Sequence, residues 1–564
     1  MEIDFGLTTF LCRSRKETIN CILKRLYSDF IVLEIDGSKN VTRLLTVSEA
    51  NTQELQTTND TVKLNDIPRP SVFSEEFQRL CDAVFAHESD ETKLETSSLD
   101  KSERGQVHGY IRARYGEVLD SETASDACII VKKSKNNTKR RRWGQDTPPY
   151  VHFTMEKENK ETSFALGIVA KMSGCNISLF KSCGLKDRRG VTAQRVSAFQ
   201  VHPDKLRGLN ARLRDIVLYD FEYKKEPVRT GSHWGNRFCI LLRDIDPCHE
   251  DVLRCRLEEW DTLGFINYYG TQRFGSCETR TADVGRLILQ RKWKEAVMEI
   301  LGGGARNGND TVQKAVEVYK ESEDAGAALK ELKGCQQYAS IEGQILRTLS
   351  KGKSWQESVI QLPNGTKSLY VHAYQSLLWN RLASSRVSLH GTSTVNEDLD
   401  EKGESLNEER SHFDVHIPLA SSSCTDRKGY AFTFYEKVLE SDGLNWDSFR
   451  TLERNFSLGD SSTLQLRPLF VKPGDVKWQF VRYSDRNEQI QQSLTSIVEE
   501  RKNEGDLFGL KVEFDLPSGT YATVALREIT ACDMGKHHQK SLNMAAGDQN
   551  IGEEIQNEPE KNEA

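Results

Sequence analysis

Hydrophobic and polar positions along the chain predict a mixture of strands and helices. Residues 16–37 alternate between the two kinds and are β-branched in their second half, which is typical of a strand. Residues 162–174 repeat apolar side chains at helical spacing, namely Ala165, Leu166, Val169 and Met172. The pattern also predicts helices at 281–301, 312–333 and 372–388, and two strands within 507–530. Because no βαβ rhythm emerges, we expect an α+β fold.

Several polar segments interrupt these elements. Residues 86–105 predict a flexible insertion, 391–412 a disordered acidic loop, and the chain from about 535 an unstructured tail, since they contain few apolar side chains. A basic run at 132–142 ends at Trp143. This run can be a solvated charge run, a nuclear localisation signal or an RNA contact. We favour the RNA contact because Trp143 offers a stacking surface directly after the cations.

The composition narrows the class of protein. With 564 residues, 37% of them hydrophobic, the chain is long enough for about two to four domains with sizeable cores. The net charge of -7 gives no sign of nucleic-acid binding by the whole molecule, so an RNA-binding surface must be a local patch. Cysteines without a C-x-x-C pair indicate reduced thiols and no zinc site. No apolar run approaches the ~18 residues of a membrane span, so we expect no membrane partner.

One segment, residues 183–197, suggests chemistry. Asp187 lies between Lys186 and the pair Arg188 and Arg189. Such a cluster can be a surface turn with solvated salt bridges. It can equally hold a carboxylate ionised by neighbouring cations, available as a nucleophile. The residue types alone leave both readings open.

A family resemblance favours the second reading. The segment resembles the G-x-K-D-x-x-A-x-T-x-Q signature of the TruD family of pseudouridine synthases, and the positions that match are Gly184, Lys186, Asp187, Thr192 and Gln194. Gly190 stands where the family usually has alanine. We expect the missing methyl group to loosen the loop that aims Asp187.

Six further blocks resemble family blocks in the same order: Lys24 to Ile35, 150–166, 231–243, 264–275, His372 to Asn380, and 513–528. An insertion at 84–149 is similar to those of eukaryotic Pus7-type members. The resemblance implies an α+β, mixed-sheet pseudouridine synthase core with an inserted family-specific TRUD domain. We expect core segments at 1–83 and 150–279, the inserted domain at 280–470, a C-terminal part of the fold at 471–534, and a disordered tail at 535–564.

The implied reaction needs no cofactor and no metal. Isomerising uridine breaks the N1–C1′ bond and joins C5 to C1′, without redox or phosphoryl transfer. By resemblance Asp187 is the nucleophile, and Lys24 is the cation that keeps it ionised. The sequence offers no candidate for the base that takes the proton from C5.

The resemblance also implies contacts to a uridine extruded from the RNA. Phe30 and Tyr269 are the matching aromatic positions for stacking, with core packing as the alternative. Asn267 can read a uracil edge, because its amide offers a donor and an acceptor. Arg273 and Arg25 are candidates for phosphate contacts, with solvated salt bridges as the alternative. Lys186, beside the nucleophile, is a further candidate for substrate binding.

The expected partner is RNA. The resemblance implies tRNA first and messenger RNA as a further class, and we expect a monomer that works in the nucleus and also in the cytoplasm. One alternative is an RNA-binding protein that has lost catalysis, which retention of Asp187 disfavours. A second is a protein-interaction scaffold, which only the acidic loop and the tail support. An activity assay separates the first alternative, and salt-sensitive RNA binding the second.

Overall fold

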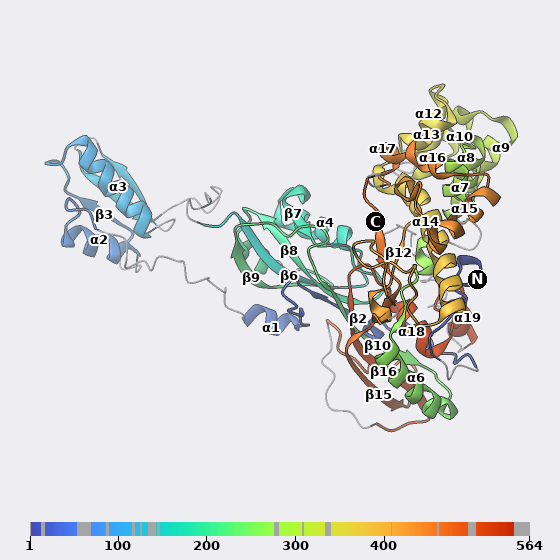
Figure 1. Cartoon of the computed structure of the whole chain (residues 1–564). Helices are drawn as coiled ribbons and strands as arrows, with labels where there is room; N and C mark the ends of the chain where they lie inside the picture. Colours follow the sequence, from blue (N-terminus) through green and yellow to red (C-terminus); the bar gives the residue numbers. More distant parts are fainter. Residues whose placement is uncertain are drawn as a thin grey trace.

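The computed structural model describes residues 2–12, 17–52, 69–85, 89–115, 119–124, 127–133, 143, 147–275, 281–306, 310–332, 340–407, 409–458, 462–494 and 503–545. Strands and helices mix in one chain, so the predicted α+β class is confirmed. Figure 1 shows the helices of residues 281–456 gathered beyond one end of the central sheet.

A nine-stranded sheet forms the centre, in the order β15-β16-β10-β2-β8-β6-β9, with β1 added at β10 and β7 at β8. Its strands are β1 (Ile22–Leu23), β2 (Phe30–Ile35), β6 (Tyr150–Glu158), β7 (Phe180–Ser182), β8 (Val191–Phe199), β9 (Ile216–Lys224), β10 (Gly235–Arg243), β15 (Gly474–Tyr483) and β16 (Leu507–Pro517). Within the described part of this sheet β2 and β8 pair in parallel, whereas the other pairs are antiparallel. The sheet therefore combines strands from the first half of the chain with strands near its C-terminal end.

Helices cover this sheet because each strand turns alternate apolar side chains to its faces. The helix α4 (Thr162–Ser173) packs Ala165 and Val169 against Phe153 of β6. On β10 and β16 lie α6 (Glu250–Leu263) and α18 (Ala522–Thr530), with Trp260 edge-on to Phe514. Shorter helices near the sheet are α1 (Val47–Thr52), α5 (Pro203–Arg207) and the 3-10 turns η1 (Glu2–Phe5), η2 (Tyr27–Asp29), η4 (Ile177–Leu179) and η5 (Pro247–His249).

A helical unit follows in the chain and centres on α14 (Asn364–His390). Helix α7 (Thr281–Leu289) packs against it at Gly285, where a Cβ atom would lie 2.0 Å from the Tyr370 carbonyl oxygen. The other elements are η6 (Thr271–Phe274), α8 (Trp293–Arg306), α9 (Asp310–Ser322), α10 (Ala325–Glu331), α12 (Ile341–Ser350), α13 (Trp355–Ile360), η7 (His412–Asp414), η8 (Ser422–Cys424), α15 (Tyr430–Ser441), α16 (Trp446–Arg450) and α17 (Glu453–Phe456). Two small antiparallel sheets join β11 (Phe265–Ile266) to β14 (Phe470–Val471), and β12 (His416–Pro418) to β13 (Leu466–Pro468).

The predicted insertion contains a small folded unit rather than a flexible segment. Strands β3 (Glu91–Leu94), β5 (Ile129–Lys133) and β4 (Leu119–Thr123) form one antiparallel sheet, and α2 (Glu75–Phe85) and α3 (Lys101–Tyr115) complete the unit. Its separate hydrophobic core includes Phe73, Cys81 and Ile111. The expectation of a flexible insertion is therefore wrong for residues 89–105, and residues 86–88 lie outside the described part. Since Phe73 belongs to this core, the unit also begins before residue 84.

The helix predictions are largely confirmed, with breaks that the pattern does not show. Residues 162–174 form α4 as expected. The predicted helix 281–301 is divided at Arg291, and the predicted helix 312–333 at Glu323, where the backbone turns left-handed with φ of 63° and 52°. The second predicted strand within 507–530 is wrong, because α18 occupies that place. Ala522, Ala525, Leu526 and Ile529 of α18 repeat at helical spacing, so the expected strand overlooked a helical pattern that the sequence contains.

The described residues of the acidic segment, 391–407 and 409–412, are packed, contrary to the expectation of a disordered loop. Arg386 of α14 pairs at 2.5 Å with Asp398, and both side chains are fully buried. Leu399 bridges to Ser405 and His416. The segment is thus anchored by a buried ion pair that charge composition alone cannot reveal.

The tail is also more ordered than expected. Helix α19 (Lys536–Ala545) follows residue 535, and its buried Gln539 accepts a hydrogen bond from the Leu23 amide at 2.8 Å. The expectation of a disordered tail is therefore wrong for 536–545, and residues 546–564 lie outside the described part.

Most of the basic run, 134–142, also lies outside the described residues. Trp143 donates to the Thr147 carbonyl at 2.9 Å and packs against His202 and Tyr223. Its ring is partly buried, so the stacking surface predicted for RNA serves internal packing here.

Candidate active site

The parallel pairing of β2 and β8 brings two distant loops together. Val32 lies opposite Thr192 in this register, so the N-terminal ends of both strands lie side by side at the same end of the sheet. The turn before β2 carries Lys24, and the loop before β8 carries Asp187. The sequence resemblance identified these two residues, and the strand pairing is the reason that they meet.

Lys24 and Asp187 form an ion pair beside the N-terminal ends of β2 and β8. The Lys24 ammonium donates to the Asp187 carboxylate at 2.7 Å, and the side chains are 21% and 36% exposed. The same ammonium lies 3.9 Å above the Phe30 ring. Lys24 has a φ of 60°, a left-handed conformation that non-glycine residues rarely adopt. The arrangement stabilises a carboxylate that is ionised and still reachable from solvent.

A buried lysine, Lys157 of β6, holds the backbone of the Asp187 loop. Its ammonium donates to the carbonyl oxygens of Asp187 at 3.0 Å and of Lys186 at 3.4 Å, and its side chain is buried. Sequence reasoning missed this residue, although it lies in the block 150–166. A lysine in an alternating strand ordinarily points to solvent, so the pattern gave no signal of this role.

The start of helix α4 anchors the same loop from another side. The Thr162 hydroxyl accepts from the Lys186 amide at 3.0 Å and donates to Gln194 at 2.9 Å. Gln194 in turn donates to the Gly184 carbonyl at 3.0 Å. The signature residues Gly184, Lys186 and Gln194 are thus joined by hydrogen bonds that fix the loop ahead of Asp187.

Lys186 points into the sheet. Its ammonium donates to Asn236 at 2.7 Å and lies 3.0 Å from a Glu34 oxygen, close enough for an ion pair, although no hydrogen-bond geometry is met at that oxygen. Both side chains are buried. Burial and the nearby Lys186 charge lower the pKa of His233. The predicted substrate-binding role of Lys186 stays a prediction, and the structure gives this side chain a place inside the protein.

Gly190 permits a close approach rather than a loose loop. A Cβ atom on Gly190 would lie 2.5 Å from the Phe30 carbonyl oxygen, so the loop rests directly on the start of β2. The Gly190 carbonyl also accepts from the Asn159 amide at 3.2 Å. The expectation that the missing methyl group loosens this loop is therefore wrong for this structure.

Arg189 links the two loops through their backbones. It donates to the carbonyl oxygens of Lys24 at 3.1 Å and of Arg25 at 3.3 Å. Its guanidinium lies 5.4 Å from the Tyr27 ring centre. Sequence reasoning treated Arg189 only as a neighbouring cation of Asp187, and this positioning contact spans too many residues for a local pattern to reveal.

Three other predicted site residues gather around Arg467. This arginine donates to the Asn267 side-chain oxygen at 2.8 Å and lies 4.1 Å from the Tyr269 ring centre. Asn267 also donates to the Pro468 carbonyl at 3.1 Å. Arg273 donates to the Tyr521 hydroxyl at 2.9 Å. Both ends of the Asn267 amide are engaged within the protein, so its uracil-reading role stays a prediction.

Phe30 and Tyr269 are both buried, at 2% and 8% exposure. Phe30 packs edge-on to Phe238, and Tyr269 packs edge-on to Trp379. The core-packing alternative therefore describes their present contacts. Phe30 also lies directly beneath the Lys24 ammonium, which places it within the Lys24–Asp187 site.

Two further findings concern other kinds of site. Within the described ranges, no cluster of three histidine, cysteine, aspartate or glutamate side chains is arranged to hold a metal ion. The described helices include none that is both long and apolar enough to cross a membrane.

Residues 124–529 match the family model described as tRNA pseudouridine synthase D (TruD). The chain belongs to the TruD family. A Caenorhabditis elegans protein named as a candidate pseudouridine synthase is 39% identical, over 95% of this chain and 93% of its own. Multisubstrate pseudouridine synthase 7 of Schizosaccharomyces pombe is 27% identical, over 96% of this chain and 92% of its own.

The fold also resembles a solved family structure. A TruD crystal structure from Methanosarcina mazei superposes with a TM-score of 0.55 at 17% identity, and the match covers 94% of this chain and 97% of the other. Membership of the TruD family makes the protein an RNA pseudouridine synthase, an isomerase, of the Pus7 type predicted from the sequence. The alternative of an inactive RNA-binding protein is not favoured.

Proposed function

We propose that the protein isomerises uridine in tRNA, and in messenger RNA as a second substrate class, with Asp187 as the nucleophile. The 2.7 Å pair between Lys24 and Asp187 is the observation that carries this proposal. The carboxylate is 36% exposed, whereas the residues that fix its loop are buried. An ionised carboxylate that is held in place and is accessible to an RNA substrate suits the role of a nucleophile.

The reaction conserves all atoms. The Asp187 carboxylate attacks the sugar or the base, the N1–C1′ bond breaks, and the uracil turns before C5 bonds to C1′. The C5 proton then leaves and N1 gains one. Lys24 stabilises the carboxylate before attack and again when the bond to Asp187 is released. Lys157 and Arg189 hold the backbones of the two loops, so that these groups need not reorganise during the reaction.

The proposed RNA classes rest on the relatives. The family model is described by its tRNA activity, and the Schizosaccharomyces pombe relative is named as multisubstrate. We propose that the protein works as a monomer in the nucleus and also in the cytoplasm. Mapping pseudouridine in tRNA and messenger RNA from cells with and without the protein identifies the modified uridines and separates the two classes.

The variant Asp187→Asn tests the nucleophile. The change keeps the shape of the side chain and removes its charge, so we expect no detectable pseudouridine and a tRNA affinity within a few fold of wild type. Asp215→Asn is a matched control, because Asp215 pairs with Lys160 at 2.9 Å and lies outside the Asp187 loop. Conversion at the wild-type rate by Asp187→Asn would end the proposed mechanism.

A further inference from the structure

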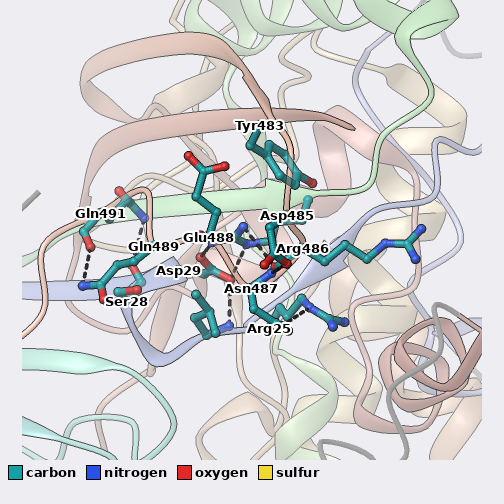
Figure 2. A network of polar contacts seen from close by, with 12 residues as sticks. Arg25, Ser28, Asp29, Tyr483, Asp485, Arg486, Asn487, Glu488, Gln489 and Gln491 are labelled. Carbon is teal, nitrogen blue, oxygen red and sulfur yellow. Dashed lines mark hydrogen bonds and ion pairs between the residues drawn. The ribbon is translucent and has the colours of Figure 1, made fainter. Parts of the chain in front are cut away.

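A segment that follows β15 lies against the turn that carries Arg25, Ser28 and Asp29 (Figure 2). We call residues 484–494, which follow β15, the strap. Gln491 of the strap donates to the Ser28 carbonyl at 3.0 Å. Arg25, next to Lys24, donates from its Nε atom to the Asn487 side-chain oxygen at 3.2 Å. Two strap side chains therefore bond to the turn between Lys24 and β2.

Arg243 strengthens this junction from within the sheet. It donates to both carboxylate oxygens of Asp29, at 2.6 and 2.8 Å, and both side chains are fully buried. It also donates to the carbonyl oxygens of Arg486 at 3.3 Å and of Glu488 at 2.9 Å. Asp29 accepts from the Leu26 amide at 2.8 Å, which closes the turn. Arg243 thus joins the Lys24 turn and the strap into one network.

The turn needs such support because of its backbone. Lys24 has a φ of 60°, a strained conformation that a residue with a side chain keeps only where the surrounding structure holds it. Arg189 holds the carbonyl oxygens of Lys24 and Arg25 from the Asp187 side. Arg189 thus binds the backbone of Arg25, whereas Asn487 of the strap binds its side chain.

We propose that Asn487 of the strap is a positioning residue that acts through Arg25 to aim the Lys24 ammonium at Asp187. The inference rests on the proposed function of that pair. Asn487 is exposed, so its side chain is not part of a hydrophobic core, and its backbone N–H donates to the Asp485 carboxylate at 2.8 Å. The Asn487 backbone is therefore held in place while its side-chain oxygen accepts the hydrogen bond from Arg25.

The variant Asn487→Ala tests the proposal by single-turnover kinetics on tRNA. We expect the rate at saturating tRNA to fall about 3- to 10-fold, because one hydrogen bond of ordinary net strength is lost at an exposed site. The tRNA concentration for half-saturation should stay within about twofold. Asn487→Asp keeps an oxygen acceptor for Arg25 and should restore most of the rate. Asn503→Ala is the matched control, since Asn503 is exposed and caps the Arg482 amide of the same β15–β16 hairpin.

A combined variant shows whether Asn487 acts through Lys24. If it does, adding Asn487→Ala to Lys24→Met should slow the rate no further than Lys24→Met alone. Independent, multiplying losses would overturn the proposal, as would an unchanged rate in Asn487→Ala. A rise in half-saturation at an unchanged maximal rate would overturn it too, and would make the Arg25–Asn487 region an RNA contact. Failure of the proposed function is distinct, because the wild-type protein would then leave tRNA unmodified or Asp187→Asn would keep the wild-type rate.

Discussion

The buried partnership of Lys186 and Glu34 makes the variant Lys186→Met a sharp test of the site. Methionine fills a similar volume but leaves the Glu34 carboxylate in the sheet without its cation, 3.0 Å away in the wild type. Glu34 also accepts from the Arg195 amide at 3.0 Å and has no exposed surface. Removing one member of a buried ion pair costs about 3–5 kcal/mol.

Protonation of Glu34 in Lys186→Met gives a similar estimate of the loss of stability. The stranded carboxylate can stay buried by taking up a proton, and protonating an ordinary glutamate at pH 7 costs about 4 kcal/mol. At pH 5 the same protonation costs only about 1 kcal/mol. The loss of stability in Lys186→Met should therefore be large at pH 7 and should shrink as the pH falls to 5.

Urea unfolding of Lys186→Met at several pH values measures this loss. Lys160→Met is the matched control, because Lys160 pairs with a half-exposed Asp215 and such pairs contribute about 0–1 kcal/mol. Adding Glu34→Gln should recover part of the stability at pH 7. If Lys186→Met were as stable as wild type at pH 7 and instead bound tRNA weakly, the reasoning would be refuted, and Lys186 would be the substrate contact predicted from the sequence.

Three further outcomes are expected. Lys24→Met should lower the single-turnover rate at least about tenfold and change tRNA affinity less, since the ammonium lies on Asp187 at 2.7 Å; an affinity loss alone would make Lys24 a phosphate contact. Burial raises the pKa of Glu156 to about 7, so its proton favours the folded state, and that contribution is present at low pH and lost as the pH rises through 7. Glu156→Gln should remove this slope, up to about 3 kcal/mol, from melting measured between pH 5 and 8; an unchanged slope would contradict the assignment. Alanine at Lys139 to Arg142 should weaken tRNA binding and flatten its salt dependence, with single-turnover chemistry at saturation nearly intact. An unchanged salt slope with loss of nuclear accumulation would instead favour a localisation signal.

The spacing of apolar residues along the sequence was the main evidence for the predicted helices. Helix α4 has one buried face, and the spacing of Ala165 and Val169 revealed it. Helix α18 carries the same kind of signal, since Ala522, Ala525, Leu526 and Ile529 repeat at helical spacing, but the segment was interpreted as a strand. The acidic segment around Asp398 was predicted to be disordered because its charge pattern is visible, whereas the buried Arg386 that neutralises Asp398 lies on another element.

Some residues of the candidate site were predicted from the sequence, and others were missed. Lys24 and Asp187 followed from a resemblance that runs from about residue 20 to 530, and their contact needs the β2–β8 pairing, which no local pattern encodes. Lys157 and Arg189 were missed because they act on backbone carbonyl oxygens. Such contacts depend on where the chain passes in space, and a lysine or arginine that makes them has no distinctive neighbours in sequence.

The strand order has a consequence for how the enzyme is made. Lys24 and Asp187 are 163 residues apart, and Arg25 and Asn487 are 462 apart. Contacts of such long range form slowly, because loop closure must precede any gain from pairing. A chain emerging from the ribosome can pair β2 with β8 well before β16 exists to cover the edge of β10. Premature termination between those points would therefore leave a protein that contains Asp187, lacks the strap that bonds to the Lys24 turn, and exposes a strand edge open to aggregation.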